Sequence, residues 1–365
     1  MAMVEQAVGF ARPPVVQNLV RNIMRILFRG TKSAIAAGFA LPDNLYQSIC
    51  EAKFDCGMSI QHKNRLDHVS DILTHHGIKG PWEPLCATGV SNRIYATKEV
   101  VLRIATDHAD ALADARTESI AAPAARAAGV LTPRLLVFDD SLTLLDRPYS
   151  IWERISGETL GLLPSYLRSR RETWADVGRQ LARLHTRVNE CPDPLGWLDQ
   201  PGRELGLADR LAELGSASRI DRAIATEIAR WIEALQPAVA TTTQQRFLHN
   251  DIHDMNLMCS QEGSLLAVID WGDAGWGDPA LEFAQIPLAV MPFVIAAYEV
   301  EAPGFLGDAA EARIIWDHLD YALAALPDDP RLLLELRRFL RTSGDRWRRA
   351  SRAAAANPDD VTREK

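Results

Sequence analysis

The sequence predicts an α+β protein with two lobes, a small lobe built on an antiparallel sheet followed by a larger helical lobe. Two observations predict this architecture. Strand-like segments come first and helix-like segments dominate after Gly157, so the pattern changes over residues 153–160. The 365 residues are enough for two domains or for one large two-lobed domain with a sizeable core. A crevice between two lobes is a common place for a ligand.

The small lobe is predicted to begin with a helix that ends at Gly77 and to continue as strands around one further helix. In chain order we expect a helix at 64–76, a hairpin of strands at 86–96 and 100–105, a mostly helical segment at 115–129, and strands at 133–140 and 148–156. Pro123 starts or interrupts the second helical segment, because proline lacks the N–H that a helix interior uses.

The larger lobe is predicted to be mainly helical, with a few short strands inside it. We expect helices at 171–188, 207–215 and 219–235, several helical segments beyond 280, and short strands at 246–249, 256–259 and 265–270. The expected division is an extension at 1–63, a small lobe at 64–155, a larger lobe at 156–350, and a disordered tail at 351–365.

The composition is that of a soluble globular protein, 47% hydrophobic and 24% charged. The sequence has no apolar run of the roughly 18 residues that would suggest a membrane span, and it lacks the pattern of a secretory signal. Its cysteines are scattered without a C-x-x-C spacing, at Cys50, Cys56, Cys86, Cys191 and Cys259. We therefore expect neither a zinc site nor a disulfide framework, and a cytoplasmic location.

The charge is unevenly distributed along the chain. The net charge is −8, and residues 1–63 carry seven Lys and Arg against four Asp and Glu, so the remainder carries −11. This balance argues against nucleic-acid binding and favours a cationic small molecule, unless it serves solubility alone. Within the extension, residues 13–28 have helical spacing with a basic stripe. This helix could pack on its own domain, lie on a membrane surface, or join two subunits through residues 13–30.

One short stretch of the larger lobe is dense in polar groups. Residues 247–258, FLHNDIHDMNLM, place two His, two Asp and two Asn in twelve positions. The following apolar strand, LLAVID, ends at Asp270. A hairpin of this length would bring Asn256 and Asp270 together, with Asp251 projecting from the same loop. Hard oxygen ligands of this kind suit Mg²⁺, which usually keeps waters and shares substrate phosphates.

The order of these residues matches the catalytic arrangement of kinases: His-x-Asp, four residues, Asn, then an apolar strand ending in Asp. With HNDIHDMNLM and VIDWGDAGWGDPALEFA, the chain resembles the aminoglycoside phosphotransferase family of small-molecule kinases, whose fold is related to those of choline kinases and protein kinases. The resemblance covers about residues 64–345 and implies a two-lobed protein-kinase-like fold. One departure is Asn250, where the family commonly has Gly.

The resemblance implies how the small lobe would hold ATP or GTP. Arg103 stands where many kinases have Lys and would hold the α- and β-phosphates, with its position fixed by Glu118 on the following helix. The segment TGVSNRIYA resembles the loop that covers the nucleotide, and YSIWERISGETL resembles the strand and linker beside its base. The implied nucleotide contacts there are Ser91, Asn92, Glu153 and Ile155.

In the helical lobe, the resemblance makes Asp251 the residue that orients the acceptor hydroxyl and accepts its proton. Asn256 and Asp270 would hold Mg²⁺, which offsets charge on the phosphates. His253 would reach the transferring phosphate or face solvent, and His249 would brace the loop. Without catalysis, these Asp and Asn side chains would simply satisfy backbone donors in a polar turn.

The acceptor is predicted to bind after Asp270, where four acidic residues are candidates: Asp273, Glu282, Asp317 and Asp320. They would bind ammonium groups of an aminoglycoside or a polyamine-like drug, or form a solvated face. The leading hypothesis is an ATP- or GTP-dependent kinase for a hydroxyl on a small molecule, giving antibiotic resistance where that molecule is a drug. A metabolite kinase of choline, homoserine or sugar type is the second hypothesis. A nucleotide-binding pseudokinase with a recruiting N-terminal helix is the third, and the intact set of Asp and Asn residues argues against it.

Overall fold

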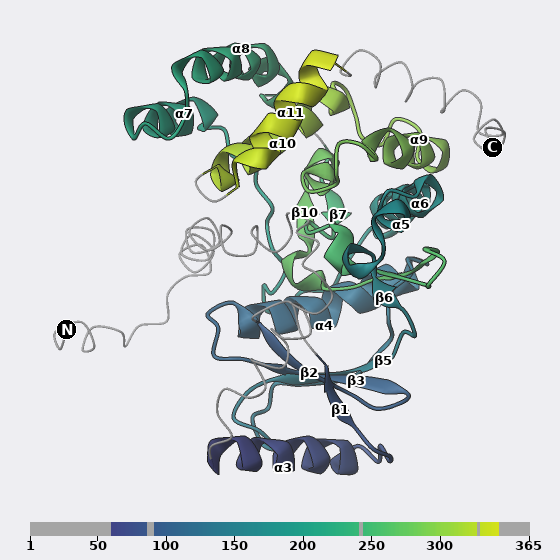
Figure 1. Ribbon diagram of the computed structural model, residues 1–365. Helices are drawn as coiled ribbons and strands as arrows, with labels where there is room; N and C mark the ends of the chain where they lie inside the picture. The colour runs from purple at the N-terminus through teal and green to yellow at the C-terminus, as the bar shows by residue number, and fades with distance from the viewer. Residues whose placement is uncertain (1–59, 86–90, 241–243, 327–328, 343–365) are drawn as a thin grey trace.

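The computed structural model describes residues 60–85, 91–240, 244–326 and 329–342, which form two lobes (Figure 1). Several expectations lie outside these residues: the helix at 13–28, the subunit contact at 13–30 and the tail at 351–365. No helix in the described ranges is long and apolar enough to cross a membrane.

The small lobe is built on a five-stranded antiparallel sheet with the strand order β1-β2-β3-β5-β4. Its strands are β1 (Glu83–Leu85), β2 (Asn92–Ala96), β3 (Val100–Ala105), β4 (Leu135–Asp139) and β5 (Tyr149–Glu153). The predicted hairpin is confirmed as β2 and β3, with Asn92 opposite Ala105 and Ile94 opposite Arg103. The short strand β1 is an addition that the sequence pattern did not predict.

Two helices cover opposite faces of this sheet (Figure 1). Helix α3 (Ile60–His75) packs apolar side chains such as Ile72 and Leu73 against the sheet, and the chain leaves it through Gly77, whose φ of 69° is the left-handed conformation that glycine adopts easily. Helix α4 (Ala111–Ala127) lies on the face toward the helical lobe. It runs through Pro123, which therefore neither starts nor ends it.

The helical lobe begins after β5 and contains most of the buried core. Its helices are α5 (Ser165–Arg168), α6 (Arg171–Arg187), α7 (Leu207–Ser216), α8 (Arg222–Val239), α9 (Met291–Glu301), α10 (Ala310–Ala325) and α11 (Pro330–Thr342). Helices α6 and α9 approach closely because Gly178 has no side chain, and a Cβ there would collide with the Val294 carbonyl. Helices α7, α8, α10 and α11 share a second apolar cluster around Trp316.

Short strands inside this lobe carry the polar stretch singled out above. They are β6 (Glu158–Thr159), β7 (Arg246–Leu248), β8 (Leu257–Cys259), β9 (Leu265–Val268) and β10 (Gly275–Gly277), which form the sheets β6-β8-β9 and β10-β7. Of the strands labelled in Figure 1, β6 lies beside α4 and the small lobe, and β7 and β10 lie deeper in the helical lobe. The α+β architecture with a small sheet lobe and a larger helical lobe is confirmed.

Candidate active site

The loop between β7 and β8 holds the catalytic candidates on a rigid hairpin. Strands β8 and β9 pair with Leu257 opposite Val268, and the Ile269 N–H donates to the Asn256 carbonyl at 3.0 Å. This pairing places Asn256 beside the end of β9, from which Asp270 projects. The hairpin predicted from the sequence therefore brings the Asn and the second Asp to one end, as expected.

Asn250 takes a backbone conformation that explains its place in the loop. Its φ is 64°, in the left-handed region that favours Gly but that Asn adopts more readily than most residues. The loop thus keeps a geometry suited to the Gly that the family commonly has there. Asp270 also has a positive φ, 69°, which turns its carboxylate back toward the small lobe at the end of β9.

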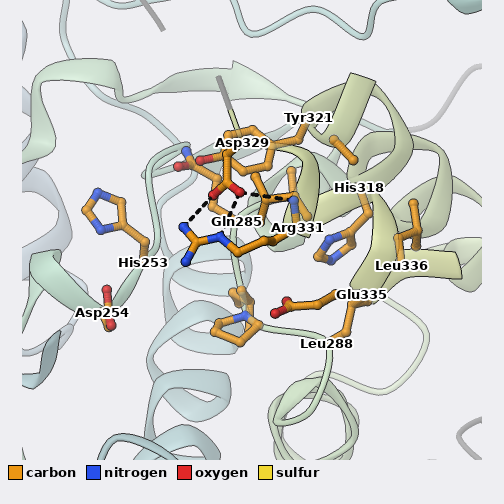
Figure 2. Close-up of a pocket in the computed structure, with 15 residues that line it drawn as sticks. His253, Asp254, Gln285, Leu288, His318, Tyr321, Asp329, Arg331, Glu335 and Leu336 are labelled. Atoms are coloured by element: carbon orange, nitrogen blue, oxygen red, sulfur yellow. Dashed lines mark hydrogen bonds and ion pairs between the residues drawn. The ribbon is translucent and has the colours of Figure 1, made fainter. Parts of the chain in front are cut away.

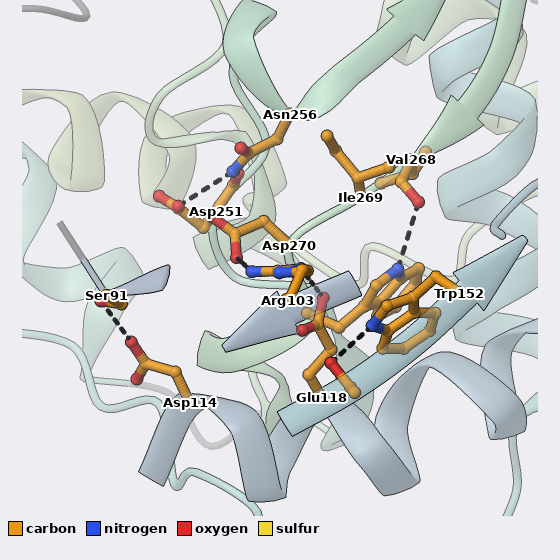
Figure 3. A network of polar contacts seen from close by, with 12 residues as sticks. Ser91, Arg103, Asp114, Glu118, Trp152, Asp251, Asn256, Val268, Ile269 and Asp270 are labelled. Atoms are coloured by element: carbon orange, nitrogen blue, oxygen red, sulfur yellow. Dashed lines mark hydrogen bonds and ion pairs between the residues drawn. The ribbon is translucent and has the colours of Figure 1, made fainter. Parts of the chain in front are cut away.

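Three side chains donate to, or lie beside, the carboxylate of Asp251. Asn256 Nδ2 donates to Oδ2 at 3.0 Å, and Gln285 Nε2 donates to Oδ1 at 2.6 Å. His253 Nε2 lies 3.5 Å from Oδ2. The Asp251 side chain keeps 16% of its surface exposed, so the carboxylate is held in one orientation while it remains partly accessible. Figure 3 shows Asp251, Asn256 and Asp270 close together above Arg103.

His253 contacts both the backbone and Asp251. Its Nδ1 accepts a hydrogen bond from the Met255 N–H at 3.2 Å, which leaves Nε2 to donate toward Asp251. Burial is the largest effect and works against a charge on this ring, but the carboxylates of Asp251, Asp254 and Asp270 together outweigh burial and raise the His253 pKa. His253 thus adds positive character next to Asp251.

His249 and Glu282 are both fully buried, and their hydrogen bonds hold the loop in place from inside the protein. His249 Nε2 bonds with the Ile269 carbonyl at 2.9 Å. Glu282 accepts from the backbone N–H groups of His249 and Asn250 at 2.9 and 2.8 Å, and it lies 3.3 Å from His185 Nε2. The bracing role expected for His249 agrees with these contacts.

Arg103 joins the two lobes at the site (Figure 3). Its Nη1 donates to Glu118 Oε1 at 2.5 Å and its Nη2 donates to Asp270 Oδ1 at 3.0 Å. Burial opposes the charge on Arg103, but these two carboxylates outweigh it and raise the guanidinium pKa. Burial raises the pKa of Glu118 to about 7, against the opposing effect of the Arg103 charge. The structure thus brings together the Arg and Glu that the family resemblance paired.

Helix α4 also packs directly on the turn after Asp270. A Cβ at Gly272 would lie 2.8 Å from the Cβ of Asp114, so a side chain at this position would push α4 away. Asp114 in turn accepts a hydrogen bond from Ser91 Oγ at 3.1 Å. The β2 edge, α4 and the Asp270 turn are therefore held in contact.

The remaining nucleotide candidates line the sheet beside this point. Asn92 begins β2 opposite the last residue of β3, and residues 86–90 of the same loop lie outside the described ranges. Glu153 ends β5, and its carboxylate accepts from the Arg134 N–H at 3.3 Å. Ile155 follows in the linker, where its carbonyl accepts from the Gly157 N–H at 3.1 Å.

A pocket of about 370 Å³ lies on the other side of the catalytic loop, in the helical lobe (Figure 2). Residues 284–288, α10 and α11 form its walls, and the loop reaches it with His253 and Asp254. The polar residues that line it are His253, Asp254, Gln285, His318, Tyr321, Asp329, Arg331 and Glu335. Gln285, in the wall of this pocket, contacts the candidate carboxylate Asp251 directly.

Hydrogen-bond acceptors and carboxylates predominate in this pocket. Burial lowers the pKa of His318 to about 4, so its ring is neutral at pH 7. The one arginine, Arg331, is paired with Asp329 through Nε and Oδ1 at 2.9 Å. Asp254 and the exposed Glu335 add two further carboxyl groups. The lining therefore suits a ligand rich in hydrogen-bond donors.

The four acidic candidates for substrate binding lie in different places from those expected. Glu282 is buried under the loop, as described above. Asp317 is 4% exposed, and its two oxygens accept from Arg203 Nε and Nη2 at 2.7 and 2.8 Å. These two predictions are wrong, because both carboxylates are buried and bonded within the protein. Asp320 pairs with Arg210, and Asp273 lies in the turn after Asp270; neither belongs to the pocket lining.

A comparison with known families decides the assignment. The model of the phosphotransferase enzyme family matches residues 84–313, more than half of the chain. The chain belongs to this family. No curated protein sequence matches the chain.

Solved structures of phosphotransferases share the fold. Wild-type aminoglycoside 2'-phosphotransferase-IIIa, in its GDP complex, is 15% identical with a TM-score of 0.52, and the alignment covers 81% of this chain and 99% of that one. A choline/ethanolamine kinase family protein from Mesorhizobium loti is 18% identical with a TM-score of 0.44, covering 84% and 96%. The first likeness confirms the protein-kinase-like fold that the resemblance implied.

Within this phosphotransferase, sequence reasoning missed the residues that connect the catalytic loop to the pocket. Gln285 follows the segment PALEF and belongs to no spacing that suggests chemistry. Arg331 and Glu335 lie on α11, 60 or more positions after Asp270, so only the fold brings them near the loop. Asp278, just before this segment, accepts from the Ala280 N–H at 3.0 Å and so caps the 3-10 helix at Pro279–Phe283.

Proposed function

We propose that this phosphotransferase transfers the γ-phosphoryl group of ATP or GTP to a hydroxyl of a small molecule bound in the 370 Å³ pocket. One observation carries the proposal: the Asp251 carboxylate lies between the metal and phosphate candidates on one side and the pocket on the other. Asn256 contacts one of its oxygens and Gln285, from the pocket wall, contacts the other. A hydroxyl at the pocket end would therefore meet the base and the terminal phosphate together.

Asp251 would act on the acceptor hydroxyl. A hydroxyl is a poor nucleophile, so a carboxylate that accepts its hydrogen bond orients the oxygen and takes the proton as the new P–O bond forms. The hydrogen bonds from Asn256 and Gln285 hold the carboxylate in that orientation before the acceptor arrives. His253 would stabilise negative charge near the transferring group, since its pKa is raised.

Asn256 and Asp270 would hold Mg²⁺. They offer one amide oxygen and one carboxylate, and the Asp270 side chain is 44% exposed, so coordination sites remain for waters and phosphate oxygens. Bound Mg²⁺ supplies charge neutralisation for the β- and γ-phosphates. On nucleotide binding, Arg103 would share its guanidinium between Glu118 and the phosphates, since its contact with Asp270 competes with the metal.

The small lobe would bind the rest of the nucleotide. We assign the base to the backbone near Glu153 and Ile155, and the phosphates to the loop that ends at Ser91 and Asn92. This assignment keeps residues 64–155 as the nucleotide-binding lobe and residues 156–350 as the lobe for catalysis and the acceptor. A cytoplasmic location fits the free thiols of Cys191 and Cys259.

For the acceptor we propose an aminoglycoside-like drug or another antibiotic with donor-rich groups, which the carboxyl groups of the pocket favour. The size of the pocket supports a second candidate. At about 370 Å³ it is near the small end of ligand sites, which suits a metabolite of sugar or amino-alcohol type. The intact Asp251, Asn256 and Asp270 set disfavours a pseudokinase.

Nucleotide turnover tests the proposal directly. The full-length protein with MgATP and with MgGTP is assayed against a panel of aminoglycosides, macrolides, choline, ethanolamine, homoserine and sugars, with product mass measured. We expect one class to stimulate nucleotide consumption and to gain the mass of one phosphoryl group. Binding of nucleotide without transfer to any acceptor or to water would favour the pseudokinase hypothesis.

A further inference from the structure

Gln285 connects the catalytic carboxylate to the pocket. It follows the 3-10 helix at Pro279–Phe283, lines the pocket, and donates from Nε2 to Asp251 Oδ1 at 2.6 Å. A carboxylate oxygen accepts only, so the amide must present its nitrogen to Asp251. This requirement fixes which way round the Gln285 amide lies: Nε2 contacts Asp251, and the carbonyl oxygen Oε1 does not.

The amide oxygen of Gln285 remains available to a ligand. Among the described residues, the contact with Asp251 is the one hydrogen bond that this side chain makes. Fully buried polar atoms that lack a partner are found elsewhere in the described part of the chain, and Oε1 is not one of them. Oε1 therefore keeps some exposed surface. A carbonyl oxygen has two lone pairs, and it accepts from N–H or O–H groups but donates to none.

We propose that Gln285 is a positioning and specificity-determining residue, which selects acceptors that carry a second hydrogen-bond donor next to the hydroxyl that receives phosphate. This inference rests on the proposed function. The reacting hydroxyl would donate to Asp251 Oδ1, and the second group would donate to Gln285 Oε1. The acceptor class is therefore a diol or an amino alcohol with neighbouring donors.

The surroundings of Gln285 reinforce this selection. Asp254 and Glu335 are acceptors, His318 is neutral, and the charge of Arg331 is offset by Asp329. A quaternary ammonium alcohol has no N–H to offer, so Gln285 Oε1 would lose its water without gaining a bond. Leaving a polar group unpaired is what makes a site built for hydrogen bonding reject an analogue that lacks the donor.

Matched pairs of acceptors test the selection. Ethanolamine is compared with choline, and a sugar with its deoxy analogue at the carbon next to the acceptor position, using MgATP and MgGTP. In the wild-type protein we expect kcat/KM to be at least about tenfold higher for the member with the extra donor. In Gln285→Met, which keeps the volume but has no amide, this ratio should fall to about one.

A second variant separates positioning from specificity. Gln285→Glu keeps an acceptor toward the pocket but places a negative charge beside Asp251, so the preference should persist. The Asp251 carboxylate would then lose the N–H that holds it, so kcat should fall at least about tenfold while the KM for the acceptor changes less. Gln245→Met, at an exposed glutamine outside the pocket, serves as the control and should match the wild type.

The outcomes are distinguishable. Turnover with no donor preference in the wild type, or with a preference that survives in Gln285→Met, would overturn the role of Gln285 and leave the kinase function standing. An unchanged kcat in Gln285→Glu would remove the positioning role. If the wild type neither phosphorylates an acceptor nor hydrolyses the nucleotide, the proposed function fails and this inference fails with it.

Discussion

Two pairs of carboxylates in the helical lobe, Asp251 with Asp270 and Glu282 with Asp317, differ in their surroundings. Asp251 and Asp270 have side chains that are 16% and 44% exposed, and their contacts are with side chains at the site. Glu282 and Asp317 have side chains that are 0% and 4% exposed, and each is bonded through both oxygens. Carboxylates of this lobe thus fall into two kinds: two that are accessible at the site and two that are buried inside the protein.

The difference teaches which carboxylates can take part in chemistry. A buried carboxylate must be paired or hydrogen-bonded, because an uncompensated charge in the interior is costly. Glu282 meets that need with backbone N–H groups, and Asp317 meets it with the fork of Arg203. Neither has the exposed surface through which Asp251 and Asp270 could meet a substrate. The four predictions below test this division, beginning with the largest expected effect.

Asp251→Asn should abolish most of the transfer activity. The amide keeps the shape but cannot accept a proton, so turnover should fall by about 1,000-fold while nucleotide affinity stays within about twofold. Acceptor-stimulated nucleotide consumption and calorimetric titration of nucleotide measure the two quantities. Asp176→Asn, at a surface residue paired with Arg179, is the control and should leave both unchanged. A variant with full turnover would remove Asp251 from its assigned role.

Glu282→Ala should damage stability as well as activity. It leaves the N–H groups of His249 and Asn250 without a partner inside the protein, which costs about 3 kcal/mol of unfolding free energy. Denaturant unfolding followed by circular dichroism measures the loss. Turnover should fall too, because these N–H groups set the start of the catalytic loop. Glu233→Ala on the exposed face of α8 should change stability by less than about 0.5 kcal/mol. Unchanged stability in Glu282→Ala would argue that the carboxylate is not a brace.

Much of the fold and of the catalytic loop could be predicted from the sequence, because both depend on local rules. Apolar segments of strand length predict β2 and β3, and helical spacing predicts α6. The spacing from Asp251 to Asn256 and the strand that ends at Asp270 place those groups together through hairpin geometry alone. Such features need no knowledge of distant contacts.

The pocket and the fate of the other acidic residues could not be predicted, because they depend on distant partners. Asp317 is buried since Arg203, 114 positions away in sequence, packs against it. Asp320 lies on the same helix three residues later, yet its side chain is 23% exposed and paired with Arg210. Nothing in the local pattern WDHLDYAL distinguishes the two. The role proposed for Gln285 likewise follows from its contact with Asp251, which the local sequence does not predict.

Asp317→Asn and Asp320→Asn make the third prediction, as a pair on one helix. Asp317→Asn should cost about 2 kcal/mol of unfolding free energy, because among the described residues Arg203 then keeps only Asp278 as a charged partner. Asp320→Asn should cost less than about 1 kcal/mol, as an ion pair nearer the surface does. Neither should change the KM for the acceptor. A raised acceptor KM in Asp317→Asn at unchanged stability would restore the substrate-binding interpretation.

Arg103→Lys makes the fourth and smallest prediction, and it tests the contact that joins the exposed carboxylate Asp270 to the small lobe. Lys is a point charge, so it can approach Glu118 or Asp270 but cannot reproduce the fork that holds both at 2.5 and 3.0 Å. Many kinases have Lys at this position, so the variant should remain active. We expect the KM for nucleotide to rise about tenfold with a smaller change in kcat, since the lost hydrogen bond aligns the phosphates in the ground state as well as during transfer.

Arg93→Lys is the matched control. It lies on the neighbouring strand, opposite Ile104, on the sheet face that packs on α3. Equal nucleotide KM values for Arg103→Lys and the wild type would show that a single positive charge is sufficient, and that the fork between Glu118 and Asp270 belongs only to the nucleotide-free protein.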